Sequence, residues 1–104
     1  MTNTEIVKKA VEMLRKTNKV IFKIIDIKPW DSDGSVELDI IYLGKNNDHR
    51  KQNFGFSDNW FDLNKNPLDL NDECGMDKVK NEDTKLILRI MYYLYAVWYL
   101  DEIK

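Results

Sequence analysis

The sequence predicts an α+β domain in which two helices pack against a three-stranded antiparallel meander, in the order α-β-β-β-α. Apolar residues recur every three or four positions near the N-terminus, alternate with polar residues in the middle, and fill a continuous segment near the C-terminus. The first and last patterns are typical of helices, and the middle pattern is typical of strands with one buried face. A chain of 104 residues that is 43% hydrophobic can bury its own core, so we expect a single domain spanning residues 1–104.

The segment TNTEIVKKAVEMLRKTNK, which starts at Thr2, predicts an amphipathic helix. Its apolar residues share one helical face. They are Ile6, Val7, Ala10, Val11, Met13 and Leu14. Thr2, Asn3 or Thr4 can cap the first turn, and Glu5 suits the positive end of the helix dipole. The helix is expected to end near residues 17–18.

The next segment, KVIFKIIDIKPW, is rich in β-branched residues and predicts the first strand. Its apolar residues change face between Ile24 and Ile25. That shift indicates either a β-bulge near these residues or a strand buried on both faces. Pro29 is expected to end regular pairing. The DSDG that follows predicts a turn, with Gly34 in the positive-φ region.

Two further strands are predicted after the turn. In SVELDIIYL the apolar residues Val36, Leu38, Ile40 and Tyr42 alternate with polar ones, so they are expected to share the core face. HRKQNFGF is a weaker strand in which Phe54 and Phe56 are in phase, with Gly55 between them.

The remaining 48 residues, 57–104, divide into an irregular segment and a helix. Residues 57–77 show no periodicity and are rich in Asn and Asp, although they include several large apolar residues. We expect this segment to pack onto the domain, with a short helical turn. A long hydrophobic helix is predicted to start near Asp77 or Asn81 and to end near Ile103, with Asn81, Glu82 and Asp83 supplying the cap and the dipole complement.

The apolar segment LILRIMYYLYAVWYL, residues 86–100, contains one charge, Arg89. After Arg89 the unbroken apolar run is Ile90–Leu100, which is eleven residues, whereas a membrane-spanning helix needs about twenty. We therefore predict no membrane span. A helix that is apolar on every side is buried on more than one side. The sheet and the first helix are expected to cover about half of it, and the remainder must be covered by residues 57–77 or by another chain.

No catalytic or cofactor motif stands out. His49 is the single histidine, and the single cysteine, Cys74, lies among acids that raise a thiol's pKa. The acids Asp69, Asp72 and Glu73 have no spacing that fixes a metal geometry. We therefore predict no enzyme, no cofactor and no metal site. One thiol cannot form an internal disulfide, which favours a reducing, cytoplasmic setting.

The leading functional hypothesis is a small cytosolic protein-binding module, either homodimeric or acting like an inhibitor or immunity protein. Large uncovered apolar surfaces usually mark interaction sites, and residues 58–104 carry ten acidic against six basic side chains. The candidate interface consists of aromatic residues and an acidic rim. The aromatic residues are Trp60, Phe61, Tyr92, Tyr95, Trp98 and Tyr99, and the rim is Asp69, Asp72 and Glu73.

The alternative hypothesis is single-stranded nucleic-acid binding through residues 50–56. Arg50 and Lys51 can bind phosphates, and Phe54 and Phe56 can stack on bases if they are exposed. The same two phenylalanines also fit a core-facing strand. The net charge of −2 gives no overall attraction to nucleic acid, so protein, in the form of another chain or a second copy, is the expected partner.

Overall fold

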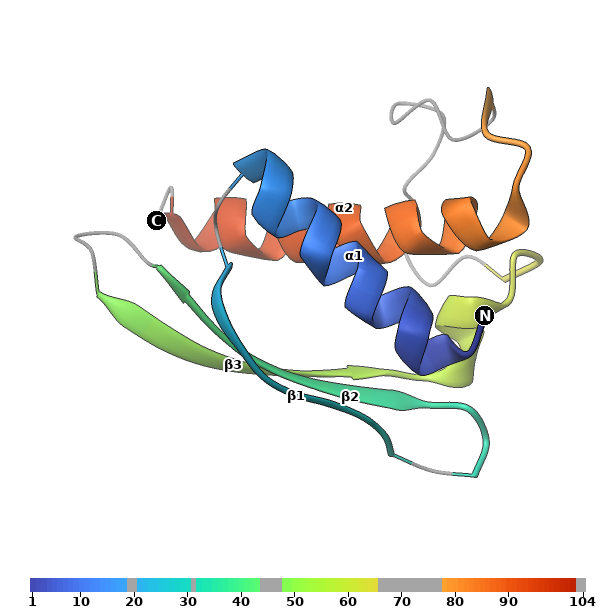
Figure 1. Ribbon diagram of the computed structural model, residues 1–104, viewed down its shortest axis with the longest axis horizontal. Helices are drawn as coiled ribbons and strands as arrows, with labels where there is room; N and C mark the ends of the chain where they lie inside the picture. Colours follow the sequence, from blue (N-terminus) through green and yellow to red (C-terminus); the bar gives the residue numbers. More distant parts are fainter. Residues whose placement is uncertain (19–20, 31, 44–47, 66–77, 103–104) are drawn as a thin grey trace.

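The computed structural model describes residues 1–18, 21–30, 32–43, 48–65 and 78–102, with the backbone alone at residues 18, 21–23, 43 and 99–102. The predicted α-β-β-β-α order and α+β class are confirmed (Figure 1). The elements are α1 (Asn3–Asn18), β1 (Ile21–Pro29), β2 (Val36–Leu43), β3 (His49–Phe56), the 3₁₀ helix η2 (Asp58–Phe61) and α2 (Glu82–Glu102).

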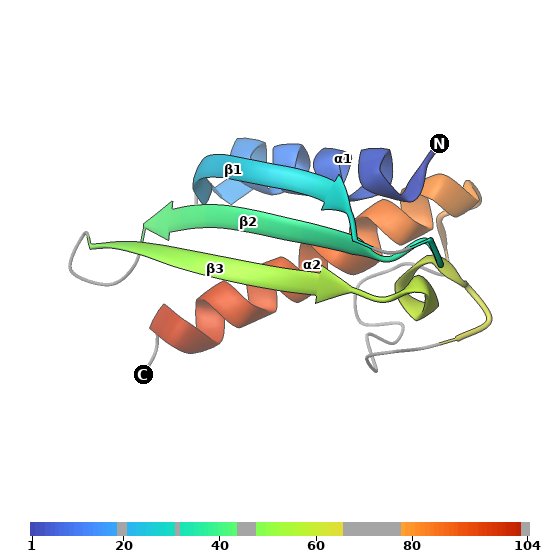
Figure 2. The same cartoon turned by 90° about the horizontal axis from the view of Figure 1, so that it is seen from below.

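The molecule has two layers. Its antiparallel sheet has the order β1-β2-β3, so β2 is central. Both helices lie on one face of the sheet, and the other face is open (Figures 1 and 2). Helix α1 lies over β1, while α2 crosses diagonally behind β2 and β3. The core residues of the sheet therefore come from the face that the helices cover.

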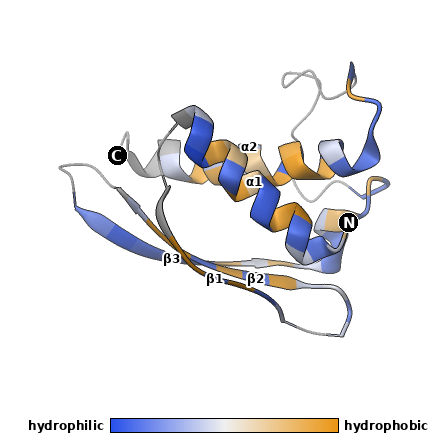
Figure 3. Cartoon of the chain, viewed as in Figure 1, coloured by the Kyte–Doolittle hydropathy of each residue, from blue (hydrophilic) through white to orange (hydrophobic). Residues whose placement is uncertain are grey.

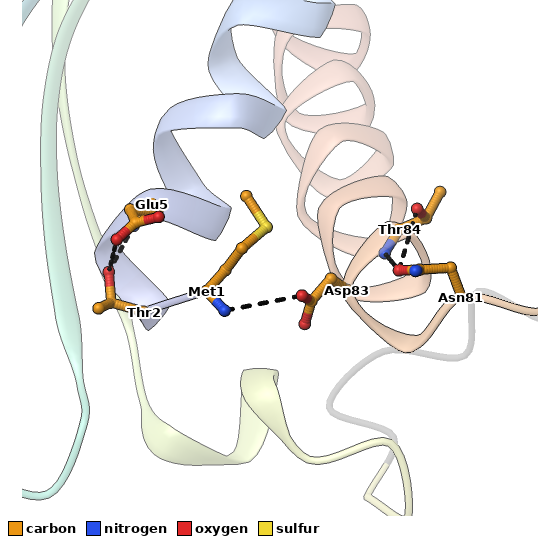
Figure 4. A network of polar contacts seen from close by, with 6 residues as sticks. All are labelled: Met1, Thr2, Glu5, Asn81, Asp83 and Thr84. Atoms are coloured by element: carbon orange, nitrogen blue, oxygen red, sulfur yellow. Dashed lines mark hydrogen bonds and ion pairs between the residues drawn. The ribbon is translucent and has the colours of Figure 1, made fainter.

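The two helices begin side by side, and each has a capping residue (Figure 4). The Glu5 amide donates to Thr2 Oγ1 at 3.2 Å, and the Thr84 amide donates to Asn81 Oδ1 at 3.0 Å. Such side-chain acceptors satisfy amides that have no partner within the helix. The predicted caps at Thr2 and Asn81 are thus confirmed, and the Met1 amino group, 3.7 Å from Asp83 Oδ2, links the two helix starts.

Strand β1 is irregular where the sequence predicts it. The pairing with β2 shifts register between Ile24 and Asp26, and also between Ile21 and Lys23. Ile25 is the extra residue of the first shift, and its side chain is 46% exposed. Of the two alternatives, the bulge is therefore confirmed and the strand buried on both faces is excluded. The strand ends at Pro29, as predicted.

The turn from β1 to β2 also follows the prediction at Gly34, which has φ +93°. Its carbonyl accepts a hydrogen bond from Asn3 Nδ2 at 2.9 Å, which ties the turn to the start of α1. The Ser35 side chain and amide both hydrogen-bond to Asp33, and these bonds lower the pKa of that carboxyl.

The core lies between the layers. Five α1 residues are at most 2% exposed: Ile6, Val7, Ala10, Val11 and Leu14. The sheet contributes Val36, Leu38, Ile40, Tyr42, Phe54 and Phe56, and α2 contributes Leu86, Ile87, Ile90, Met91 and Leu94. In Figure 3 apolar residues predominate through the middle of α2, and the N-terminal half of β3 is coloured hydrophilic. The predicted core faces of the first helix and the second strand are thus confirmed, except that Met13 is only partly buried.

Candidate protein-interaction surface

Burial along α2 decreases from its N-terminal half to its C-terminal half. Among residues 86–91 only Leu88 is not buried, whereas among residues 92–98 only Leu94 is buried. The remaining side chains of the second group are half-buried: Tyr92, Tyr93, Tyr95, Ala96, Val97 and Trp98. The C-terminal half of α2 therefore exposes apolar and aromatic surface in the part of the chain that the structure describes.

Arg89 anchors the irregular segment to α2. Its side chain is 8% exposed, and Nη1 donates hydrogen bonds to the carbonyls of Trp60 at 3.2 Å and Asp62 at 3.0 Å. Burial lowers the pKa of the guanidinium, and the charge of Asp62 opposes that shift. The single charge of the apolar segment thus serves the packing of η2 against α2, a role that the sequence did not indicate.

Tyr93 fixes the orientation of α2 relative to β3. Its ring packs edge-on against Phe54 and Phe56, with centroids 6.0 and 5.9 Å away, and its centroid lies 4.8 Å from that of Trp60. Residues three and four positions later share the face of a helix, so Ala96 and Val97 continue the Tyr93 face toward the C-terminus.

This face extends past the sheet. Seen from the open side of the sheet, α2 emerges beyond β3 at its C-terminal end (Figure 2). We call three residues on this side of α2 the α2 ledge: Tyr93, Ala96 and Val97. They lie on the side of the helix that faces β3, where α2 extends beyond the sheet. All three side chains are half-buried. Val97 also lines the small cavity between α2 and the sheet, so only part of the ledge is apolar surface open beside the sheet edge.

On the open face of the sheet, an aromatic side chain from the end of β1 reaches the β3 edge. Trp30 is 62% exposed, the largest exposed fraction among the large hydrophobic residues of the described segments. A Cβ built on Gly55 of β3 would lie 3.9 Å from Cζ3 of the Trp30 ring, so the indole reaches across the sheet to the edge strand. The sequence analysis missed Trp30, although its position between Pro29 and a turn is a signal for an exposed ring.

Edge strand β3 is regular, unlike β1. All eight of its residues pair with β2 in one register, from Val36 opposite Phe56 to Leu43 opposite His49. On the open face Asn53 Nδ2 donates to Glu37 Oε1 at 2.9 Å and to Asp39 Oδ1 at 2.6 Å. An edge strand directs alternate backbone N–H and C=O groups away from the sheet, where another strand can pair with them.

The structure brings only some of the predicted site residues together. Trp60 is 9% exposed and lies under Phe56 and Tyr93, so it is a core residue, and Phe61 is partly buried beside it. Tyr95 and Trp98 contact each other, with ring centroids 5.8 Å apart. The Tyr99 side chain and the acids Asp69, Asp72 and Glu73 lie outside what the structure describes.

The residues of the nucleic-acid alternative are divided between two environments. Lys51 is exposed on the open face, and Arg50 forms an ion pair with Asp48, Nε to Oδ2, at 3.1 Å. Phe54 and Phe56 are 9% and 1% exposed and point into the core. They therefore offer no open ring on which a base can stack, because the in-phase spacing serves the core instead.

A search for other kinds of site among the described residues gives little. The cavity between α2 and the sheet, lined by Leu14, Phe54 and Trp98 among others, holds about 10 Å³, which is about the space of one water. The described residues contain no group of three metal-ligating side chains. None of the helices, as far as they are described, is both long and apolar enough to cross a bilayer.

Comparison with known proteins adds no relative. No family model, no curated protein and no solved structure matches the chain.

Proposed function

We propose that this chain is a cytosolic, non-catalytic protein-binding module that binds its partner through the C-terminal half of α2. The observation that carries the proposal is the loss of burial along a helix whose sequence stays apolar. Between residues 92 and 98 six of seven side chains are half-buried, three of them tyrosines and one a tryptophan. Tyr and Trp are enriched in protein interfaces because they combine a large apolar area with a polar group.

The partner is either a second copy of the chain or another protein that this chain blocks. Both fit a group of half-buried aromatic side chains beside a sheet edge, because apolar surface that a domain leaves partly uncovered often marks such contacts. The acidic balance of residues 58–104, ten acidic against six basic side chains, favours a basic partner in the inhibitor version. It does so because complementary potential speeds encounter and guides orientation.

The test compares two apolar-to-glutamate substitutions. Ala96→Glu places a charge on the α2 ledge, whereas Ile25→Glu places one on the exposed bulge of β1, where Ile25 is 46% exposed. The tagged parent and both variants are used for affinity capture from the native host with quantitative mass spectrometry, and each is also measured for self-association. We expect Ala96→Glu to reduce the recovered partner, self or foreign, at least about tenfold, and Ile25→Glu to leave it within about twofold of the parent.

Circular dichroism and urea melts establish that both variants fold. The proposal is wrong if the parent neither self-associates nor retains any protein whose recovery depends on Ala96.

A further inference from the structure

The two edges of the sheet differ in their readiness to accept another strand. Strand β1 has two register shifts and ends in Pro29, and bulges and prolines are devices that protect a sheet edge from pairing. Strand β3 has neither a register shift nor a proline over its eight residues. A strand can therefore be added next to β3 without first removing a bulge.

The surroundings of β3 fit such an addition on both faces. An added strand would have side chains pointing to the helical layer, and these would contact the α2 ledge. They would do so because the C-terminal half of α2 extends beyond β3 on that side of the sheet (Figure 2). Side chains that point to the open face would lie beside Gly55, which adds no side chain of its own and is approached by the Trp30 ring. Apolar or aromatic contact is thus available above and below the same row of backbone groups.

The charges along this edge are complementary to a second copy of the same strand. Residues 48–52 contain two cations, Arg50 and Lys51, and one acid, Asp48, whereas residues 57–62 contain Asp58 and Asp62 and no cation. In an antiparallel arrangement about a two-fold axis the basic end of one strand lies beside the acidic end of the other, twice. A parallel arrangement would place like charges opposite each other, which is unfavourable.

We propose that two copies of the chain pair antiparallel through β3, forming a continuous six-stranded sheet in which each α2 ledge packs against the added strand of the other copy. This inference rests on the proposed function and names both its partner and its binding mode. The two-fold axis lies near Phe54 in the C-terminal half of β3, because this register places Arg50 of one copy opposite Asp58 of the other. Such an interface is self-complementary, as two-fold dimers require, and it removes the only edge of the sheet without a bulge.

The first experiment is sedimentation equilibrium of the full-length parent over a range of concentrations. We expect the mass to approach twice the 12.4 kDa of one chain. A parent that stays monomeric over this range overturns the inference. If that monomeric parent still captures a foreign protein through Ala96, the proposed function survives and an extended segment of that protein becomes the occupant of the edge.

The second experiment tests the charge pattern. Arg50→Glu and Asp58→Lys are each expected to weaken the dimer about three- to tenfold at low salt, and the double variant Arg50→Glu/Asp58→Lys is expected to restore it to within about threefold of the parent. Restoration requires the two positions to face each other across the interface. If the effects of the single substitutions add, or both are absent, the antiparallel β3 arrangement is wrong.

The third experiment locates the axis. In a Cys74→Ser background, Asn53→Cys is compared with Lys28→Cys, since both positions are exposed on the open face but Lys28 belongs to β1. A short bismaleimide is expected to convert the Asn53→Cys protein into a covalent dimer and to leave the Lys28→Cys protein monomeric. Equal cross-linking of the two variants, or cross-linking of Lys28→Cys alone, contradicts the proposed interface.

Discussion

Two glycines in this chain have opposite requirements, although both lie next to strands. Gly34 has φ +93°, and a Cβ built there would lie 3.0 Å from Asn3 Nδ2, whereas a Cβ on Gly55 would meet only the Trp30 ring at 3.9 Å. Side-chain residues are strained at positive φ, by about 1–2 kcal/mol. Gly34→Ala is therefore expected to lower the free energy of unfolding by about 1–2 kcal/mol.

Gly55→Ala is the matched control. Alanine at an extended position with open space costs little, and it lowers the entropy of the unfolded chain, so the free energy of unfolding is expected to stay within about 0.5 kcal/mol of the parent or to rise. Urea melts followed by tryptophan fluorescence measure both variants. Equal destabilisation by the two substitutions would show that the turn does not need the left-handed conformation at Gly34.

Arg89 carries the second prediction for a single residue. Replacing it with methionine keeps an apolar stem of similar length but leaves the Trp60 and Asp62 carbonyls without the donor that reaches them at 3.2 and 3.0 Å. Unfolding free energy is expected to fall by about 1–3 kcal/mol, the usual cost of leaving buried polar groups unsatisfied. Lys85→Met, one turn earlier on α2 and only partly buried, is expected to change it by about 0.5 kcal/mol at most.

The two variants are compared by chemical denaturation and by near-ultraviolet circular dichroism, to which Trp60 contributes together with the other aromatic residues. An Arg89→Met protein with the stability and the near-ultraviolet spectrum of the parent would contradict the anchoring role.

At the scale of the elements, what the sequence could predict depended on whether a pattern reports a local or a long-range property. The bulge at Ile25 is visible in the sequence because each strand residue has only two faces, so one extra residue shifts every later apolar position. The caps at Thr2 and Asn81 are likewise local. Each of these features was confirmed because neighbouring residues alone determine it.

The surroundings of α2 could not be predicted in the same way. A helix that is apolar on every side gives no direction for its partners, so the sequence did not reveal that Tyr93 faces β3 or that Arg89 reaches η2. Trp60 was expected at the surface and is only 9% exposed, because Phe56 and Tyr93 enclose it. Trp30, which the sequence analysis left out, is the exposed one. The contacts of Arg89 and Tyr93 with Trp60 span 29 and 33 positions along the chain, so no local pattern reports them.

At the scale of the whole molecule, the two-layer arrangement explains why one interface would use both layers. The helices cover one face of the sheet, and the sheet is narrower than the diagonal path of α2 (Figure 2). A small domain has too little surface to cover every apolar side of such a helix. An additional strand next to β3 widens the sheet on the side where α2 extends beyond it. The added strand would then pair with the free backbone groups of β3 and also cover the exposed side of α2.

This coupling of folding to association predicts that thermal stability depends on protein concentration. If the dimer is the stable folded form, each tenfold increase in concentration stabilises it by about 1.4 kcal/mol, or about 0.7 kcal/mol for each chain. For a domain of this size that corresponds to a rise in Tm of about 3–5 °C. Circular dichroism melts over a hundredfold concentration range, well above the dissociation constant, measure the shift. Arg50→Glu is expected to flatten the dependence at the low end of the range, where that variant is monomeric, while Ile25→Glu keeps the slope of the parent. A Tm that is constant for the parent over the whole range would show that folding does not require a second copy.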